Sequence, residues 1–281
     1  MFNLYGNLTS LDNYISTFDG GNKYNHMFEN TNVYDCSKLN TGIKSLTGIN
    51  VFEYMFSNCI NLVKVPELPA TKLADHCYEY MFNGCKSLTT IPSNLLPATT
   101  LGRYCYNSMF SGCTSLTTVP NLPATKLRAY CYQYMFNGCK SLTTIPSNLL
   151  PATKLIGSCY NSMFYSCTSL ITIPNLPATT LSTNCYNSMF YGCESLVETP
   201  KGWILKAQTT DTYSCNSMFS GCSKLKKMAV SYSGTITSSH WSGFLNGVSK
   251  TGKFYYSKNQ AKENIKSIVP SGWTLVQSTE W

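Results

Sequence analysis

At 281 residues, 43% of them apolar and 12% charged, the chain can bury a substantial core but carries about half the usual share of charge. Its net charge of +8 lies mostly in residues 200–281, which hold ten Lys or Arg and three Asp or Glu. No nucleic-acid-binding motif surrounds their dense cluster at 224–228, so a solvated basic end is the simpler interpretation. No run of about 18 apolar residues occurs, which excludes a membrane-spanning helix.

The first 21 residues, MFNLYGNLTSLDNYISTFDGG, lack a basic start, a continuous apolar core and a small-residue cleavage site. They therefore do not read as a secretory signal. We expect that the chain stays in the cytoplasm, is exported by another route or leaves the cell within a virus particle, or that an export signal has been removed.

The dipeptide Met-Phe recurs through most of the chain. It occurs at 27–28, 55–56, 81–82, 109–110, 135–136, 163–164, 189–190 and 218–219. The interval alternates between 28 and 26 residues, and the last interval is 29. Self-similarity at such a period is the signature of a solenoid, in which each unit contacts only its neighbours. We therefore predict coils of two slightly different lengths stacked in turn.

The first half of each unit predicts a short strand. In the unit SLTTVPNLPATKLRAYCYQYMFNGC, residues 115–139, Leu116 and Val119 are apolar and the Thr residues between them are β-branched. Pro120 then ends the strand because it lacks a backbone donor, and the residues NLPAT form a bend.

The second half of the unit predicts a short helix. Cys131 and Met135 are spaced i and i+4, which places them on one helical face, and Gly138 suits the left-handed residue that closes a helix. We predict an α/β repeat solenoid with one short parallel strand and one short helix in each 26–28-residue coil.

Both ends of such a stack need caps, because a terminal coil exposes an apolar face. We predict an N-terminal cap with one degenerate coil over 1–50, the repeat solenoid over 51–228, and a C-terminal degenerate coil with a closing module over 229–281. In the closing module, residues 252–258, 259–268 and 271–276 are expected to form strand, helix and strand.

The repeating motif resembles a known family. MFNGCKSLTTIP (81–92), MFSGCTSLTTVP (109–120) and MFYSCTSLITIP (163–174) resemble the BspA-type leucine-rich repeat, with Met where that repeat has Ala. The resemblance extends over about residues 27–225, and the variant found here is similar to repeat proteins of gut bacteria and their phages. It implies a leucine-rich-repeat solenoid that binds proteins or glycans and has no catalytic activity.

The fourteen cysteines recur mostly as pairs eight positions apart. Zinc sites use Cys or His residues two to four positions apart, in two such couples, and Cys-x-x-Cys does not occur. Equivalent cysteines of stacked coils would come close enough for disulfides, yet each would have two equal neighbours and no unique partner. Reduced cysteines in the core are the favoured interpretation, with some disulfides as the alternative.

Catalytic groups are sparse. The three histidines are His26, His76 and His240, the carboxylates are scattered, and no Gly-rich phosphate loop occurs. We expect no catalytic residues, no cofactor and no metal site, and we assign the Met-Phe stripe to the core.

Positions that vary from unit to unit should form columns on the surface of the stack. In the first half of the stack these columns gather Tyr and Arg, which supply binding hot spots, and Tyr also stacks on sugar rings. Drift at solvent-exposed positions is the alternative. The candidate ligand-contact residues are His76, Tyr80, Arg103, Tyr104, Arg128, Tyr130 and Tyr134.

We expect non-catalytic recognition. The leading hypothesis is a phage virion component, in a tail fibre, tail tip or capsid decoration, that binds a host-surface protein or glycan. A bacterial cell-surface adhesin of the BspA type and an intracellular protein-interaction scaffold are the alternatives. Other virion proteins are further candidate partners, a homo-oligomer is compatible with the sequence, and no specific nucleic-acid binding is expected.

Overall fold

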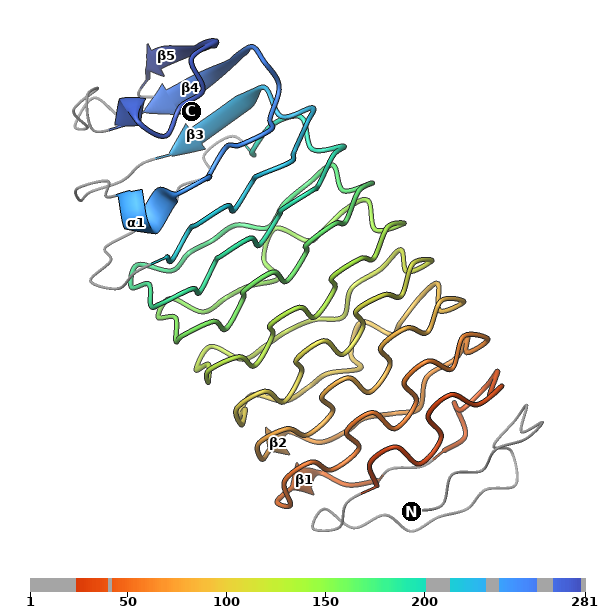
Figure 1. Ribbon diagram of the computed structural model, residues 1–281. Coiled ribbons are helices and arrows are strands. Elements are labelled where there is room, and N and C mark those ends of the chain that lie inside the picture. Colours follow the sequence, from red (N-terminus) through yellow and green to blue (C-terminus); the bar gives the residue numbers. More distant parts are fainter. Residues whose placement is uncertain (1–23, 40–41, 201–212, 231–237, 257–264, 279–281) are drawn as a thin grey trace.

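The computed structural model describes residues 24–39, 42–200, 213–230, 238–256 and 265–278. They form coils stacked along one axis, with a small parallel sheet at the C-terminal end (Figure 1). The buried apolar residues from Phe28 to Trp273 make one continuous cluster along this axis. Each coil therefore buries its apolar face against the coils on either side, as a repeat solenoid requires.

Strand pairing within the repeats is brief. Strands β1, Ser45–Leu46, and β2, Lys72–Leu73, pair in parallel, and single parallel bridges join neighbouring coils elsewhere in the stack. β2 and the bridges Lys72–Thr100 and Lys154–Thr180 lie in the segment that follows Pro-Ala-Thr, whereas the bridges at Lys64 and at Glu198 lie in the segment before Pro where strands were predicted. The predicted strand position is thus confirmed only near the two ends of the stack; at 115–120 no strand forms, although Thr117 donates a backbone hydrogen bond to Thr89 (2.8 Å).

The predicted helix is also wrong, because residues 131–139 form a run of turns. Tyr130, Tyr134 and Gly138 have φ angles of 63°, 54° and 71°, so every fourth residue is left-handed. A right-handed α-helix needs negative φ at every position. The same pattern recurs in the other described coils, and none between residues 24 and 200 contains a helix. Helix α1, Ser238–Trp241, lies beyond them.

The turns form because they leave half of the backbone amides free for the neighbouring coil. The amide of Tyr134 donates to the carbonyl of Asn161 in the next coil (3.0 Å). The amides of Gln133 and Asn137 instead close turns on Tyr130 and Tyr134 (3.2 and 3.1 Å). Alternate amides thus serve the stack and the turn, which satisfies the buried backbone donors. A helix would direct all of these amides within its own coil.

The turns also fix which side chains enter the core. Cys131 and Tyr132 are buried, Gln133 and Tyr134 face outward, and the following Met-Phe pair is buried again. The i, i+4 spacing therefore predicted the buried face correctly although it predicted the wrong backbone. Stacking of coils brings equivalent rings together with centroids 5.3 to 5.7 Å apart, in a column of Phe28, Phe56, Phe82, Phe110, Phe136, Phe164, Phe190 and Phe219.

The C-terminal end is a parallel sheet of three strands in the order β3-β4-β5: Lys227–Val230, Gly252–Tyr256 and Trp273–Gln277. Strands β4 and β5 fall on the segments predicted as strands, 252–258 and 271–276, whereas most of the predicted helix at 259–268 lies outside the described residues. The predicted domain boundaries stay predictions. Among the described residues, no helix is long and apolar enough to cross a bilayer.

Close packing between coils leaves no room for a side chain at Gly102. A Cβ there would overlap the backbone carbonyl of Ala74 in the preceding coil, whereas a Cβ at Gly157 would meet the Thr183 carbonyl at an ordinary 3.7 Å. We expect Gly102→Ala to reduce the free energy of unfolding by about 1–3 kcal/mol, as overpacking does. Gly157→Ala should leave it nearly unchanged in the same urea titration. Equal stability of the two variants would contradict this packing.

Candidate functional site

A groove of about 620 Å³ crosses successive coils in the N-terminal half of the stack. Ile49 and Ile156 come from its outermost coils, with 54% and 37% of their surface exposed, and the exposed Arg103 and Arg128 come from the coils between them. The complete lining is Ile49, Leu73, Ala74, Asp75, Thr100, Leu101, Gly102, Arg103, Arg128, Ala129 and Ile156. The groove thus combines an apolar floor with two guanidinium groups.

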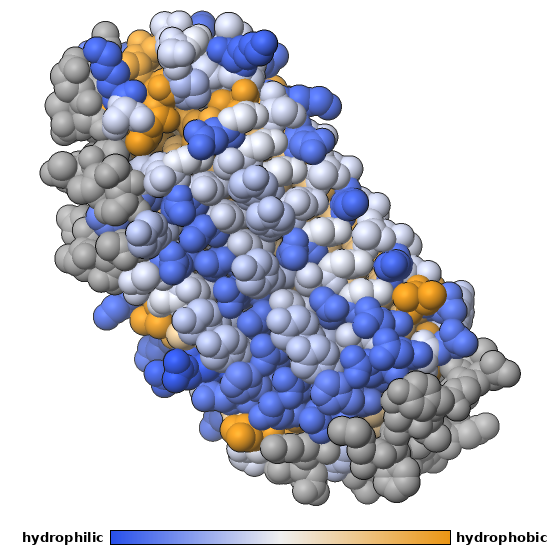
Figure 2. Space-filling view, in the orientation of Figure 1, coloured by the Kyte–Doolittle hydropathy of each residue, from blue (hydrophilic) through white to orange (hydrophobic). Residues whose placement is uncertain are grey.

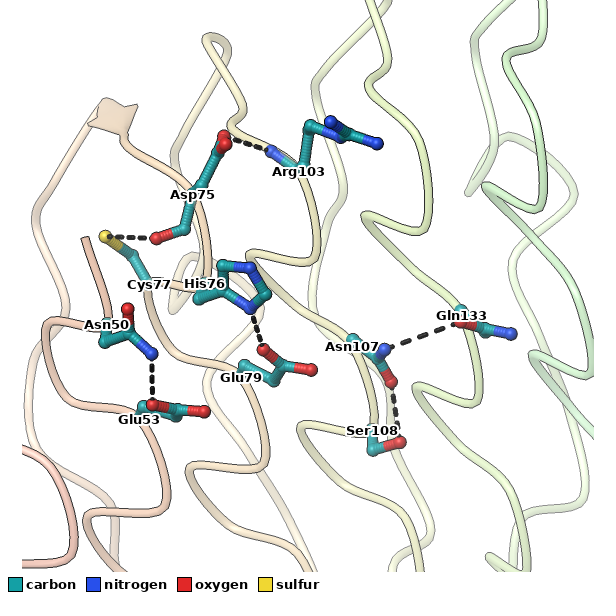
Figure 3. Close-up of polar contacts among 10 residues, drawn as sticks. All are labelled: Asn50, Glu53, Asp75, His76, Cys77, Glu79, Arg103, Asn107, Ser108 and Gln133. Carbon is teal, nitrogen blue, oxygen red and sulfur yellow. Dashed lines mark hydrogen bonds and ion pairs between the residues drawn. The ribbon is translucent and has the colours of Figure 1, made fainter.

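The acidic residue of the groove has a hydrogen-bond partner within the protein, whereas the two arginines have no ion-pair partner among the described residues. Asp75 accepts a hydrogen bond from the backbone amide of Arg103 through Oδ1 (2.7 Å), so its carboxylate fixes the loop of the next coil (Figure 3). Neither Arg103 nor Arg128 forms an ion pair with any residue that the structure describes. Both guanidiniums therefore remain available to a bound anion.

An aromatic stack borders the groove. The rings of His76 and Tyr104 lie 4.8 Å apart at 9°, and those of Tyr104 and Tyr130 lie 4.5 Å apart at 4°. Each of these residues directly follows a groove position in its coil, and each has a left-handed backbone. The stack therefore brings together three of the predicted contact residues beside Arg103 and Arg128.

The other two predicted residues lie elsewhere on the turn segments. Tyr80 continues a second stack that starts at His26 and passes through Tyr54, with centroids 4.8 and 4.5 Å apart. Tyr134 lies in the same column but is separated from Tyr80 by Ser108, and it stacks on no ring among the described residues. The predicted surface is thus one groove with its border and a neighbouring column.

Parallel stacking determines what these rings can offer a ligand. Within each stack the ring faces contact one another, so the rings present mainly their edges and polar atoms outward. A sugar ring could use a face only at the end of a stack. Figure 2 shows a largely polar face, with apolar surface mainly near the C-terminal sheet and at separate spots toward the N-terminal end.

A polar cluster that the sequence analysis missed includes His76, the first ring of the first aromatic stack. Glu53, His76 and Glu79 come from two successive coils, and each offers a ligand atom within 4.8 Å of the others. His76 Nδ1 lies 2.5 Å from Glu79 Oε2, and Asn50 donates to Glu53 Oε2 at 2.5 Å (Figure 3). Burial raises the pKa of the Glu79 carboxyl. A search for ligands that are close together in the sequence could not find this group, because Glu53 and His76 belong to different coils. Aligning the repeats would have placed Glu53 and Glu79 at equivalent positions of successive coils.

The cysteines serve packing rather than chemistry. All fourteen are free and buried. The second cysteine of a pair donates its thiol to the carbonyl of a Phe in the preceding coil, as Cys113 does to Phe82 (3.1 Å) and Cys139 to Phe110 (3.2 Å). Burial raises the pKa of Cys113 to about 12, which keeps it protonated. These thiols are therefore poor nucleophiles and poor metal ligands.

Comparison with known proteins identifies the repeat. The family model described as the BspA type leucine rich repeat region matches in six copies, over residues 24–148, 96–200 and 132–262. No curated protein and no solved structure is significantly similar to this chain. The match covers most of the described coils.

The buried thiols give a direct test of the cysteine arrangement. We expect Ellman's reagent at pH 8 to modify none of the cysteines rapidly in the folded chain, because the thiols are inaccessible and protonated. In guanidinium chloride all fourteen should react, with or without prior reduction. A lower count without reduction would reveal disulfides, and rapid reaction of the folded chain would contradict the burial.

Proposed function

Because this chain belongs to the BspA-type leucine-rich repeat family, we propose that it is a non-catalytic recognition protein that binds an extended segment of a partner protein along the groove. Proteins of this repeat family are typically non-enzymatic and act in surface or protein interaction. The observation that carries the proposal is the pair of arginines, Arg103 and Arg128, which line a mostly apolar groove without an ion pair among the described residues.

The lining of the groove defines the chemistry of the partner. Arg103 and Arg128 come from adjacent coils, so they suit two carboxylates of one extended chain. Ile49 and Ile156 supply apolar contacts toward the margins. The His76, Tyr104 and Tyr130 edges add hydrogen-bonding groups alongside. An acidic segment with aliphatic side chains fits this combination.

The aromatic stacks favour a protein ligand over a glycan. Sugar recognition by aromatic residues uses exposed ring faces, whereas most faces of His76, Tyr104 and Tyr130 are covered by one another. Arg and Tyr edges are typical of protein interfaces. The glycan alternative therefore has weaker support from the geometry.

The groove proposal predicts which ligands the chain selects. In a selection from a random-peptide display library, we expect enrichment of peptides that contain Asp or Glu together with aliphatic residues. The double variant Arg103→Glu, Arg128→Glu should bind the selected peptides at least about tenfold more weakly, because it reverses both groove charges. Fluorescence anisotropy with labelled peptides measures the loss.

A matched control separates the groove from the general charge of the chain. Lys86 and Lys140 are exposed in the repeats and do not line the groove. The double variant Lys86→Glu, Lys140→Glu should retain the affinity apart from a small electrostatic decrease. Peptides that bind both double variants equally, or a library that yields no acidic peptides, would overturn the proposal.

The setting of this recognition is a separate proposal. We propose that the chain acts in a phage particle, with a bacterial cell surface as the alternative location. The family match favours neither of the two locations. If the chain is a virion component, it should co-purify with particles through a density gradient, and particles lacking it should lose attachment or a structural layer. Particles with unchanged composition and adsorption would contradict this setting.

A further inference from the structure

One column of the turn segments has a chemical irregularity. Stacked coils align Glu53, Glu79, Asn107, Gln133, Asn161, Asn187 and Asn216, because the amide after each of the first six positions donates to the carbonyl of the next position. Amides can both donate and accept, and Asn107 Nδ2 indeed donates to Gln133 Oε1 (3.5 Å). Glu53 and Glu79, in successive coils, are carboxylates that can only accept hydrogen bonds. They therefore cannot bond to each other as the amide side chains can.

The two carboxylates have few donors around them. Asn50 donates to Glu53 Oε2, and His76 Nδ1 shares a hydrogen bond with Glu79 Oε2. The Glu79 side chain is 9% exposed, and none of the described residues donates a hydrogen bond to its Oε1. Even a protonated His76 would supply one positive charge for two carboxylates. A buried carboxylate beside another one needs a compensating cation or a shared proton.

We propose that Glu53, His76 and Glu79 form a binding site for one divalent transition-metal ion such as Zn²⁺. Imidazole nitrogen and carboxylate oxygen are both zinc ligands, and three such protein ligands leave a fourth tetrahedral position for water. The imidazole distinguishes the site from the all-oxygen sites of Ca²⁺ and Mg²⁺. This proposal does not depend on the groove.

The geometry is close to what such an ion requires. Zinc lies about 2.0–2.2 Å from N and O ligands, so tetrahedral ligand atoms are about 3.4 Å apart. The three residues already place their ligand atoms within 4.8 Å, and the ion would take the place of the proton between His76 and Glu79. Stacking on Tyr104 holds the His76 ring in plane, which reduces the conformational freedom lost on binding.

The test uses the full chain, kept reduced, and Zn²⁺ alone as the probe. We expect isothermal titration calorimetry to show one ion per chain, and the melting temperature to rise with added Zn²⁺. The variants Glu53→Gln, His76→Asn and Glu79→Gln should each weaken binding by at least about tenfold. Both Gln variants restore an amide where Gln133 stands in a later coil, so they should fold.

His26→Asn is the matched control. His26 also bonds a glutamate three residues later, Glu29, at 2.6 Å, but it lies outside the group of three ligands. This variant should bind Zn²⁺ as the unaltered chain does. Co²⁺ substitution should give weak visible bands without the strong near-ultraviolet absorption of thiolate ligation. No binding at millimolar Zn²⁺, equal loss in His26→Asn, or a thiolate spectrum would overturn the proposal.

Discussion

The division of backbone amides between the turn and the neighbouring coil is the constraint on which the whole stack depends. In residues 131–139 alternate amides bond across to the next coil, and the others close turns within the coil. This arrangement requires a left-handed residue at every fourth position, which costs about 1–2 kcal/mol for residues such as Tyr134. Burial of the Met-Phe pairs and the ladder itself offset that cost in each coil.

Stacking in register turns every sequence position into a column. A column of one residue type is scaffold, as the Phe rings and the second cysteines of the pairs show. Cysteine suits its columns because it is small, apolar and still able to donate to a Phe carbonyl. A column in which the residue type changes from coil to coil points to a function at that place. Arg103 and Arg128 give the groove its positive charge, and Glu53 and Glu79 interrupt a column of amide side chains.

Much of the architecture followed from repetition alone. The 26- and 28-residue intervals predicted the solenoid, and the family match confirms the resemblance to the BspA-type repeat. The i, i+4 spacing predicted which side chains are buried. It could not distinguish a helix from successive turns, because a helical face and a two-in, two-out turn pattern both bury Cys131 and Met135 together. The predicted strand segment pairs only near the ends of the stack, at Lys64 and over Glu198 and β3, since Pro and Thr mark bends as well as strand ends.

The sequence by itself determined the period of the stack, the buried residues and the surface columns, because all three are properties of residue order. Only the tertiary structure decided the backbone conformation, because the energy that favours turns over helix comes from hydrogen bonds to the next coil. It also decided that Arg103 and Arg128 share a groove whereas Tyr80 joins another stack. Glu53 and His76 belong to different coils, and only their stacking brings the two side chains together.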